Sequence, residues 1–230
     1  MLVPSTVSEA VALQTELARS VIRTAPPGFA PRTATGLDVA YAVDSRVVAA
    51  AVVTVDIATG EVLESATAIG EADFPYVPGL FAFRELPTLL RALSRLTVTP
   101  DLLVADGHGL AHPRRFGLAC HLGLETALPT IGVAKTPMAD YAPPADIRGA
   151  TSPLVDESEV VGVALRTQPN VKPIFVSIGH KVDLATACEH ALALSPRFRL
   201  PETTRQADHL CRRTLKNQGV TDQDARRPTR

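Results

Sequence analysis

Three acidic residues in this sequence stand where an unpaired negative charge is expensive. Asp38 interrupts a strand-like apolar run, Asp106 ends another, and Glu85 precedes a leucine-rich segment. A carboxylate held away from water costs several kcal/mol unless a cation or a hydrogen-bond donor meets it. A hard divalent metal ion is the simplest partner that all three acids can share. The sequence therefore predicts a metal-binding site, provided that the fold brings the three residues together.

The chemistry that such a site would support is hydrolysis of a phosphodiester. Three convergent carboxylates repel one another unless one of them takes a proton or a cation lies between them. Mg²⁺, or Mn²⁺ in its place, would complete its coordination with water and with phosphate oxygens of a substrate. The metal lowers the pKa of a bound water and neutralises charge on the phosphate under attack. Taken singly, each acid could be a turn, cap or solvated residue, so the prediction rests on their conjunction.

The composition is that of a globular protein with a large core. The chain has 230 residues, 46% of them hydrophobic, and no interior linker is evident. We expect a single domain over residues 1–217 and a polar, frayed tail over residues 218–230. Cys120, Cys188 and Cys211 lie far apart, so we expect free buried thiols and no disulfide framework or cysteine metal site.

The charge limits how the protein can hold a nucleic acid. A net charge of −1 and a pI near 6.6 exclude binding through bulk positive charge, although a local basic patch remains open. Dispersed basic residues form a solvated surface by default. Those near the predicted site could instead contact phosphates. The residues concerned are Arg84, Arg114, Arg115, Lys172, Lys181 and Arg205.

Nothing in the sequence indicates a membrane or secreted protein. The apolar run at residues 47–53 is too short to span a bilayer. Residues 1–12 include Glu9 and lack the basic and apolar regions of a secretory signal. We therefore expect a cytoplasmic protein without membrane contact, and we expect it to be a monomer.

The first half of the chain predicts a helix, a meander and a second helix. Apolar residues recur at helical spacing over residues 8–22. Strand-like runs at residues 35–43, 46–56 and 61–69 are joined by short turns, which is typical of an antiparallel meander. Leucines at helical spacing follow over residues 86–96. Because Pro87 fits best in a first turn, we expect Glu85 at or just before the start of that helix.

The second half predicts parallel strands joined by helices. Short apolar runs at residues 102–105 and 130–134 flank a helix expected from His112-Pro113 through Leu122, and this order implies a parallel crossover. We expect further strands at residues 160–166 and 173–178, and helices at residues 183–194, capped by Asp183, and 203–215. The sum is an α/β, ribonuclease-H-like mixed sheet of three antiparallel strands, then parallel strands, flanked by helices.

This topology explains how distant acids can meet. Parallel strands present their carboxyl ends at one edge of the sheet, where ligands bind in open α/β folds. Asp106 and Lys135 both stand at such ends. The strand that carries Asp38 is the natural neighbour of the strand that ends at Asp106, and the helix near Glu85 packs across the sheet. We therefore expect the three carboxylates to face one another.

Seven short segments follow one another along the chain. The segments are Gly36-Leu37-Asp38-Val39-Ala40-Tyr41, Pro75-Tyr76-Val77-Pro78-Gly79-Leu80, Phe83-Arg84-Glu85, Asp106-Gly107-His108-Gly109, His112-Pro113, Gly132-Val133-Ala134-Lys135 and Ser177-Ile178-Gly179-His180-Lys181. No segment is distinctive alone, but the set covers about residues 10–215 and is highly specific. In this order, the segments resemble the endonuclease V family, which acts on deoxyinosine in DNA.

The resemblance implies a ribonuclease-H-like fold and a Mg²⁺-dependent DNA repair endonuclease. Such an enzyme hydrolyses the second phosphodiester bond 3′ to deoxyinosine, leaving 3′-hydroxyl and 5′-phosphate ends. By resemblance, Asp38, Glu85 and Asp106 are the catalytic, metal-binding carboxylates. Lys135 and His180 are similar to the family's supporting catalytic residues. From the sequence alone, Lys135 could simply reach solvent, and His180 could be structural, orient water, act as a base or touch a metal.

By the same resemblance, Tyr76 is similar to a wedge that separates the strands at the lesion. Its loop also contains Pro75, Val77 and Pro78. Leu80 and Gly107 are candidates for the pocket that receives the extruded base. A stiff loop with an aromatic tip suits a wedge, because an aromatic face replaces base stacking. The same residues could instead form only a rigid connection to the next helix.

Two other functions remain open at this point. The same fold and metal chemistry could act mainly on inosine-containing RNA, or on branched or distorted DNA. The chain could also be a non-catalytic binder of inosine-containing nucleic acid, although the presence of all three acids disfavours this.

Overall fold

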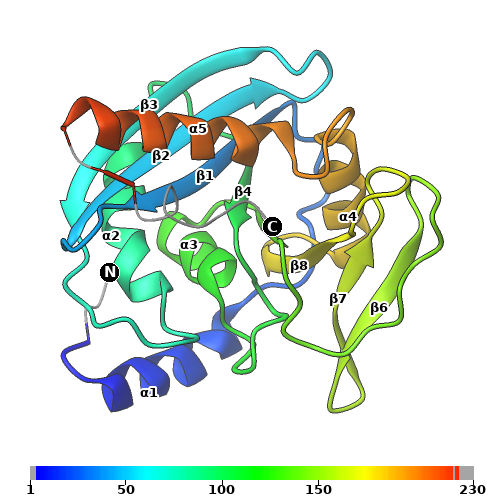
Figure 1. The fold of residues 1–230 in the computed structure, drawn as a ribbon. Coiled ribbons are helices and arrows are strands. Elements are labelled where there is room, and N and C mark those ends of the chain that lie inside the picture. Colours follow the sequence, from blue (N-terminus) through cyan, green and yellow to red (C-terminus); the bar gives the residue numbers. More distant parts are fainter. Residues whose placement is uncertain (1–3, 220, 223–230) are drawn as a thin grey trace.

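The computed structural model contains one eight-stranded mixed sheet with helices on both faces, and it describes residues 4–219 and 221–222 (Figure 1). The strand order is β3-β2-β1-β4-β5-β8-β7-β6. The strands are β1 (Thr33–Tyr41), β2 (Val47–Asp56), β3 (Val62–Glu71), β4 (Leu102–Asp106), β5 (Thr130–Ala134), β6 (Thr151–Asp156), β7 (Glu159–Leu165) and β8 (Ile174–His180). The helices are α1 (Val7–Leu17), a 3₁₀ turn (Ala18–Ser20), α2 (Ala82–Leu93), α3 (Leu118–Thr126), α4 (Leu184–Ala193) and α5 (Glu202–Asn217).

The predicted meander and the predicted parallel crossover are both confirmed. Strands β1, β2 and β3 pair antiparallel. Strand β4 runs parallel to β1, with Leu37 opposite Ala105, and β5 runs parallel to β4. Asp38 and Asp106 each follow one member of the Leu37–Ala105 pair, so two adjacent parallel strands bring these acids to one edge of the sheet. The ribonuclease-H-like fold is therefore as predicted.

Beyond β5 the sheet reverses direction. Strand β8 is antiparallel to β5, and β7 and β6 continue the antiparallel pairing to the far edge. The sequence did not predict β6. This edge strand contains Pro153 and is largely exposed, so it has neither the apolar run nor the uninterrupted donors of a central strand.

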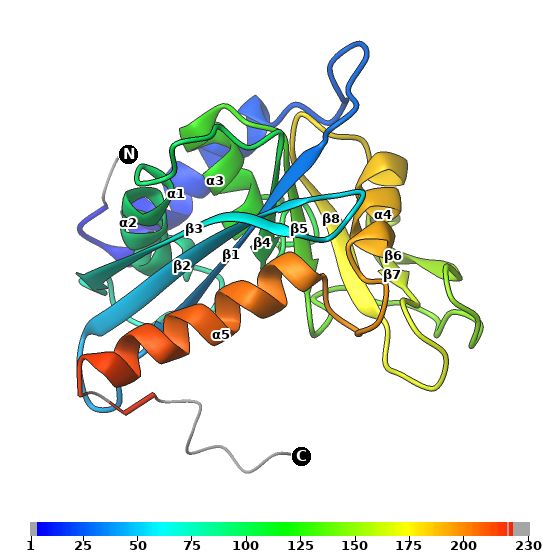
Figure 2. The ribbon, with the colours of Figure 1, turned by 90° about the horizontal axis from the view of Figure 1, so that it is seen from above.

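Two apolar clusters hold helices against opposite faces of the sheet (Figure 2). Helix α2 contributes Leu86 and Leu89, and α3 contributes Leu122, to the cluster on one face. On the other face, α4 contributes Ala187 and α5 contributes Leu215. Strands β1 and β2 contribute side chains to both apolar clusters, so most of their residues are buried.

Two helix starts differ from their predictions. Helix α2 begins at Ala82, so Glu85 lies within its first turn and Pro87 lies inside the helix. Pro87 has no N–H to donate to the carbonyl four residues earlier, and the packing of Leu86 and Leu89 outweighs this loss. Helix α3 begins at Leu118 instead of His112. Residues 108–117 form a loop whose backbone bonds to itself and to the carbonyl oxygen of Ile178.

The remaining expectations concern cysteines, membranes and the tail. The three cysteines are free thiols, two buried and one half-buried. Among the described residues, no helix is long and apolar enough to cross a membrane. Most of the tail predicted to fray, residues 220 and 223–230, lies outside the described residues. Its residues Thr221 and Asp222 pair with Val43 and Ala42 just beyond β1.

Gly36 allows α5 to approach β1 closely, and this contact predicts a stability effect. A Cβ atom at position 36 would lie 2.2 Å from the backbone carbon of Thr203. Gly36→Ala must therefore displace α5, and we expect a loss of about 3 kcal/mol in the free energy of unfolding. Urea denaturation measures this loss.

Gly60→Asn is the control for Gly36→Ala. Gly60 has a positive φ of 74° and open space around it, and asparagine tolerates this backbone conformation. Equal stability of the Gly36→Ala variant and the unmodified protein would contradict the steric argument.

Candidate active site

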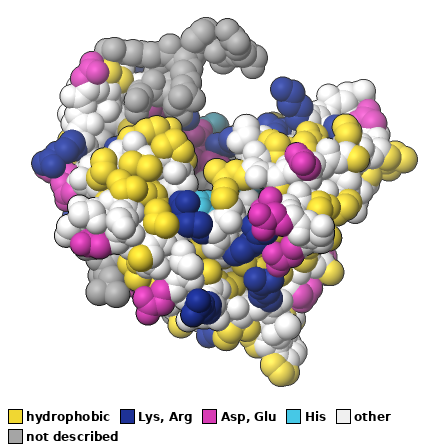
Figure 3. Space-filling view, turned by 90° about the horizontal axis from the view of Figure 1, so that it is seen from below, with side chains coloured by type: hydrophobic (Ala, Val, Ile, Leu, Met, Phe, Trp, Pro, Cys, Tyr) yellow, Lys and Arg dark blue, Asp and Glu magenta, His cyan; other side chains and the backbone are white. Residues whose placement is uncertain are grey.

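A cavity of about 660 Å³ opens at the carboxyl ends of β1, β4 and β5. Figure 3 shows a hollow in the surface with acidic and histidine side chains inside it, bordered by hydrophobic side chains. All three predicted carboxylates, Asp38, Glu85 and Asp106, line the cavity, together with Lys135. The structure therefore brings together four of the five residues expected to be catalytic.

Asp38 is held at the floor of this cavity. Its Oδ1 accepts a hydrogen bond from the N–H of Val39 at 2.8 Å. Burial raises the pKa of Asp38 well above its usual value, and the negative charge of Asp106 raises it further. The nearby Lys135 opposes this shift without cancelling it. The surroundings of Asp38 therefore disfavour its ionised form unless a further positive charge is present.

Glu85 reaches the cavity from the first turn of α2. Its Oε1 accepts a hydrogen bond from the hydroxyl of Tyr41 on β1 at 3.0 Å. Burial raises the pKa of Glu85 to about 7, and the hydrogen bond from Tyr41 only partly opposes this effect. At neutral pH Glu85 is thus poised between its protonated and ionised forms.

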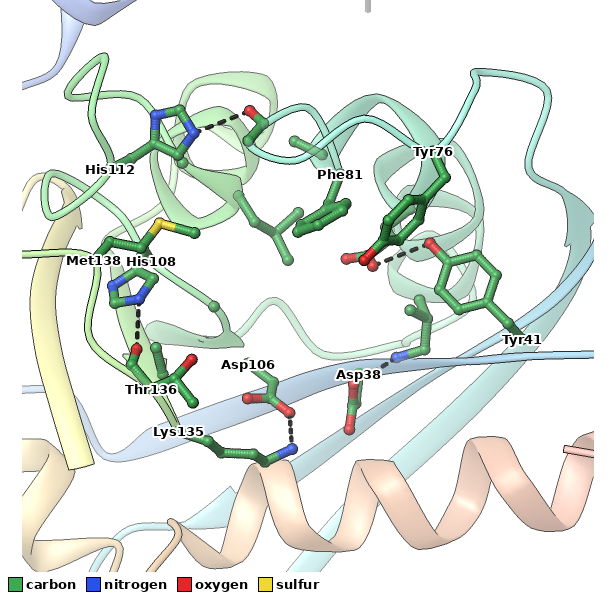
Figure 4. Close-up of a pocket in the computed structure, with 18 of the residues that line it drawn as sticks. Asp38, Tyr41, Tyr76, Phe81, Asp106, His108, His112, Lys135, Thr136 and Met138 are labelled. Atoms are coloured by element: carbon green, nitrogen blue, oxygen red, sulfur yellow. Dashed lines mark hydrogen bonds and ion pairs between the residues drawn. The ribbon is translucent and has the colours of Figure 1, made fainter. Parts of the chain in front are cut away.

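Lys135 makes an ion pair with Asp106, and Figure 4 shows the two side chains pointing toward each other beside Asp38. Burial alone would lower the pKa of Lys135, but Asp106 and Asp38 raise it above its ordinary value. Lys135 is therefore a firmly charged cation. Lys135 is thus paired with a carboxylate in this structure, instead of simply reaching solvent.

A fourth carboxylate, Asp208 on α5, also lines the cavity, and the sequence analysis missed it. Its Oδ1 accepts a hydrogen bond from Nε of Arg212 at 2.9 Å, and Arg212 bonds in turn to Asp222. The spacing of α5 carries a weak signal for Asp208. Residues 204, 208, 211 and 215 form a helical stripe whose other members are buried, so Asp208 stands where an apolar residue is expected.

The donor set around the cavity fits a hard divalent cation. Among residues 4–219 and 221–222, no three His, Cys, Asp or Glu side chains are already grouped to hold a metal ion. The available donors are nevertheless carboxylate oxygens, which Mg²⁺ and Mn²⁺ prefer. The raised pKa values of Asp38 and Glu85 show that their ionised forms are disfavoured in the metal-free site, and a bound cation would stabilise those forms.

His180 does not belong to this site, which corrects the sequence-based expectation. It ends β8, and its position pairs with Thr130 at the start of β5. Lys135 follows the other end of β5. His180 therefore lies at the opposite end of the strands from the cavity. Its Nδ1 accepts a hydrogen bond from the N–H of Ile22 at 3.2 Å. The expectation rested on the resemblance of residues 177–181, and the antiparallel direction of β8 carries His180 away from the cavity.

The wall of the cavity opposite Asp106 and Lys135 carries aromatic side chains (Figure 4). Tyr76 is 70% exposed, and its ring lies 5.1 Å from that of Phe81. Gly107 lines the cavity as predicted, but Leu80 does not. Leu80 is 1% exposed and packs into an apolar cluster with Phe74 and Phe83. Phe81, one residue later, faces the cavity in its place.

Two histidines complete the wall, and both are held neutral. Nε2 of His112 lies 2.9 Å from the carbonyl oxygen of Gly79, and its Nδ1 accepts from the N–H of Arg114. Burial lowers the pKa of His112 to about 4. His108 bonds through Nε2 to the carbonyl oxygen of Thr136, and burial lowers its pKa as well. They lie on loop segments, as expected, and not on a helix that could present a two-histidine zinc motif.

Most of the basic residues considered for phosphate contact are engaged in internal interactions. Arg115 pairs with Asp156 and Glu159, and Arg205 pairs with Glu202. The others bond to the rest of the chain as follows: Arg84 to Phe74 O, Arg114 to Gln14 and Gly79 O, and Lys181 to Ala127 O. These five basic residues therefore already have partners within the protein.

Comparison with known proteins is consistent across sequence and structure. The sequence model of a family described as Endonuclease V matches residues 15–209. A Streptomyces avermitilis endonuclease V is 57% identical over 216 residues, covering 93% of this chain and 94% of that protein. A crystal structure of the S. avermitilis endonuclease V matches with a TM-score of 0.89 at 55% identity, covering 94% and 96% of the two chains.

A more distant relative was solved with nucleic acid. The crystal structure of Ciona intestinalis endonuclease V, in complex with a 24mer DNA containing an inosine followed by a ribo-adenosine, matches with a TM-score of 0.81 at 27% identity. It covers 92% of this chain and 98% of that one.

The raised pKa of Glu85 predicts how stability depends on pH. In metal-free protein, folding favours the protonated carboxyl, so the contribution of Glu85 is fully present below its ordinary pKa of 4.5. It is lost as pH rises through about 7. Glu85→Gln lacks this titration. We expect the melting temperature of the variant, relative to the unmodified protein, to rise by a few degrees between pH 5 and pH 8.

Comparing the two proteins removes the opposite contribution of His112 and His121, whose pKa values burial lowers to about 4. Differential scanning calorimetry in the presence of a chelator makes the measurement. Glu189→Gln, at an exposed position on α4, is the control and should show no such trend. A difference between Glu85→Gln and the unmodified protein that stays constant from pH 5 to pH 8 would contradict the assignment.

Proposed function

Because this chain belongs to the endonuclease V family, we propose that it is a metal-dependent nuclease that cuts DNA at the second phosphodiester bond 3′ to deoxyinosine. The observation that carries the proposal is the convergence of Asp38, Glu85, Asp106 and Asp208 on one cavity. That cavity is bordered by an exposed aromatic residue, Tyr76, on a proline-rich loop. Carboxylates that could hold a catalytic cation and an aromatic side chain that could stack on bases thus lie side by side.

Asp38, Asp106 and Glu85, with Asp208 beside them, are the residues that would hold Mg²⁺ or Mn²⁺. Such a cation supplies an activated water and neutralises charge on the phosphate. Asp38 and Asp106 project from adjacent parallel strands, whose rigidity fixes their separation. Lys135 makes an ion pair with Asp106 and can offer a positive charge to a phosphate. Glu85, with its pKa near 7, can hold or release a proton at the same place.

Recognition of the lesion falls to the loops. Tyr76, whose ring makes a tilted contact with Phe81 and lies 5.9 Å from the guanidinium of Arg84, can stack in the gap that an extruded base leaves. Gly107 and Gly79 also line the cavity. Hypoxanthine lacks the exocyclic amines of adenine and guanine, so a pocket without room or partners for those amines rejects both normal purines.

Loss of either strand-borne acid should abolish cutting. We expect Asp38→Asn and Asp106→Asn to reduce nicking of an end-labelled inosine duplex in Mg²⁺ by at least about a thousandfold, because both acids hold the metal. Circular dichroism and the melting temperature should show that both variants remain folded. The position of the nick, read on a sequencing gel, tests the predicted offset from inosine.

His180→Asn provides the matched control for the acid variants. Because His180 lies at the opposite end of the strands from the cavity, this variant should retain kcat within about threefold. Full activity of Asp38→Asn or Asp106→Asn would refute the site.

Tyr76 should affect the nucleic acid more than the metal. We expect Tyr76→Ala to weaken binding of an inosine duplex by roughly tenfold, because an aromatic stack contributes about 1–3 kcal/mol. Binding of Mn²⁺, measured by calorimetry, should change less than twofold. Val62→Ala, a similarly exposed residue on β3, serves as the control. A Tyr76→Ala variant that loses metal affinity and keeps duplex affinity would reverse the proposed roles.

Inosine-containing RNA is the second candidate substrate. The nucleic acid in the Ciona structure carries a ribo-adenosine after the inosine, which favours keeping this alternative. The carboxylates indicate hydrolysis of a phosphodiester, but they do not indicate whether the sugar of the substrate is deoxyribose or ribose. Rates of cutting on matched inosine-containing DNA and RNA of the same sequence, under single-turnover conditions, decide between the two.

A further inference from the structure

The carbonyl oxygen of Gly79 collects three hydrogen-bond donors from two other parts of the chain. Nε2 of Gln14 lies 3.0 Å from this oxygen, Nε2 of His112 lies 2.9 Å from it, and a terminal guanidinium nitrogen of Arg114 lies 3.0 Å from it. Figure 4 shows the bond from His112 reaching the loop that carries Tyr76 and Phe81. Gly79 also has a positive φ of 79°, so a larger residue would strain this position.

Gln14 on α1 is the centre of this network. It is 1% exposed, and all of its hydrogen-bonding groups face the two loops. Its amide nitrogen donates to the carbonyl oxygens of Gly79 at 3.0 Å and Phe116 at 3.1 Å, and its Oε1 accepts from Nε of Arg114 at 2.6 Å. Because carbonyls only accept and arginine only donates, the orientation of the amide is unambiguous.

Helix α1 packs against both loops at once. Ala10 and Leu13 join an apolar cluster with Phe74, Leu80 and Phe83, at the base of the loop that carries Tyr76. Leu17 and the residues after it join a second cluster, which contains Leu110, Phe116 and Cys120. Gln14 lies between the α1 residues of the first cluster, which end at Leu13, and those of the second, which begin at Leu17. The helix therefore spans the gap between the Tyr76 loop, residues 75–81, and the His112 loop, residues 108–117.

We propose that Gln14 is a positioning residue that sets the separation of the Tyr76 loop and the His112 loop, and so determines how tightly the cavity accepts an extruded purine. The inference rests on the proposed function. The two loops supply the aromatic wall of the cavity and the histidine wall beside it, and Gln14 itself lines the cavity. Within the described residues, the hydrogen bonds of Gln14 go to two carbonyl oxygens and to Arg114, and none goes to a carboxylate. The proposed metal-binding carboxylates therefore do not depend on it.

This placement predicts a specific kinetic signature. Gln14→Met keeps the length of the side chain and removes its three hydrogen bonds, leaving the carbonyl of Phe116 and Nε of Arg114 without that partner. We expect KM for an inosine duplex to rise about tenfold, while kcat changes less than about threefold. Hydrogen exchange of the backbone amides in residues 75–81 and 108–117 should accelerate in the nucleic-acid-free protein, and that of β1 and β4 should not.

Two further variants keep the test decisive. Gln14→Glu retains an acceptor for Arg114 but loses both donations to the carbonyls, so the same changes are expected if the methionine variant does not fold. Thr15→Ala, the neighbouring exposed residue whose hydroxyl bonds only within α1, should leave KM and exchange unchanged.

A fall in kcat with unchanged KM would overturn the inference, as would exchange and KM equal to those of the unmodified protein. If the unmodified protein does not cut inosine-containing nucleic acid, the proposed function fails instead. In that case the exchange measurement still tests the role of Gln14.

Discussion

The constraint on which the rest of this structure depends is the electrostatic cost of gathering four carboxylates around one cavity. Asp38 and Glu85 are held in surroundings that favour their protonated forms, and Asp106 is partly compensated by Lys135. A protein would not retain such an arrangement for stability alone, because burying uncompensated charge is unfavourable. A cation bound there would offset this cost, since it would attract each carboxylate and stabilise its ionised form.

The fold places the carboxylates of the cavity and its aromatic and histidine walls on different kinds of element. Asp38 and Asp106 project from β1 and β4, two paired central strands of the sheet, and the close contact of β1 with α5 depends on Gly36. The cavity walls are loops, which can adopt shapes that regular elements cannot. Helix α1 joins those loops through Gln14 and two apolar clusters. Precision in the loops is thus supplied by a helix that is remote from them in sequence.

The failed expectations share one physical origin, which is that they required partners distant in the sequence. His180 was misplaced because the direction of β8 is decided by its pairing with β5. Leu80 was expected to face the cavity, but Phe81 does so instead. Burial of Leu80 against Phe74 and Phe83, and not local pattern, decides this. Asp208 was missed because α5 is rich in charged residues, and only its packing on β1 shows which of them turns inward.

The elements of the fold and a candidate metal chemistry could be predicted from the sequence alone. Hydrophobic periodicity and turn residues predicted the meander, the crossover and most of the helices, because these features reflect contacts between near neighbours in the chain. Carboxylates in apolar runs predicted the metal chemistry, because their burial is unfavourable in any fold. Only the folded chain shows that Asp208 joins the other acids, which arginines are already paired and which loop residues face the cavity. These properties arise from contacts between segments a hundred or more residues apart, such as Gln14 with Arg114 and Ile22 with His180, and no local pattern encodes them.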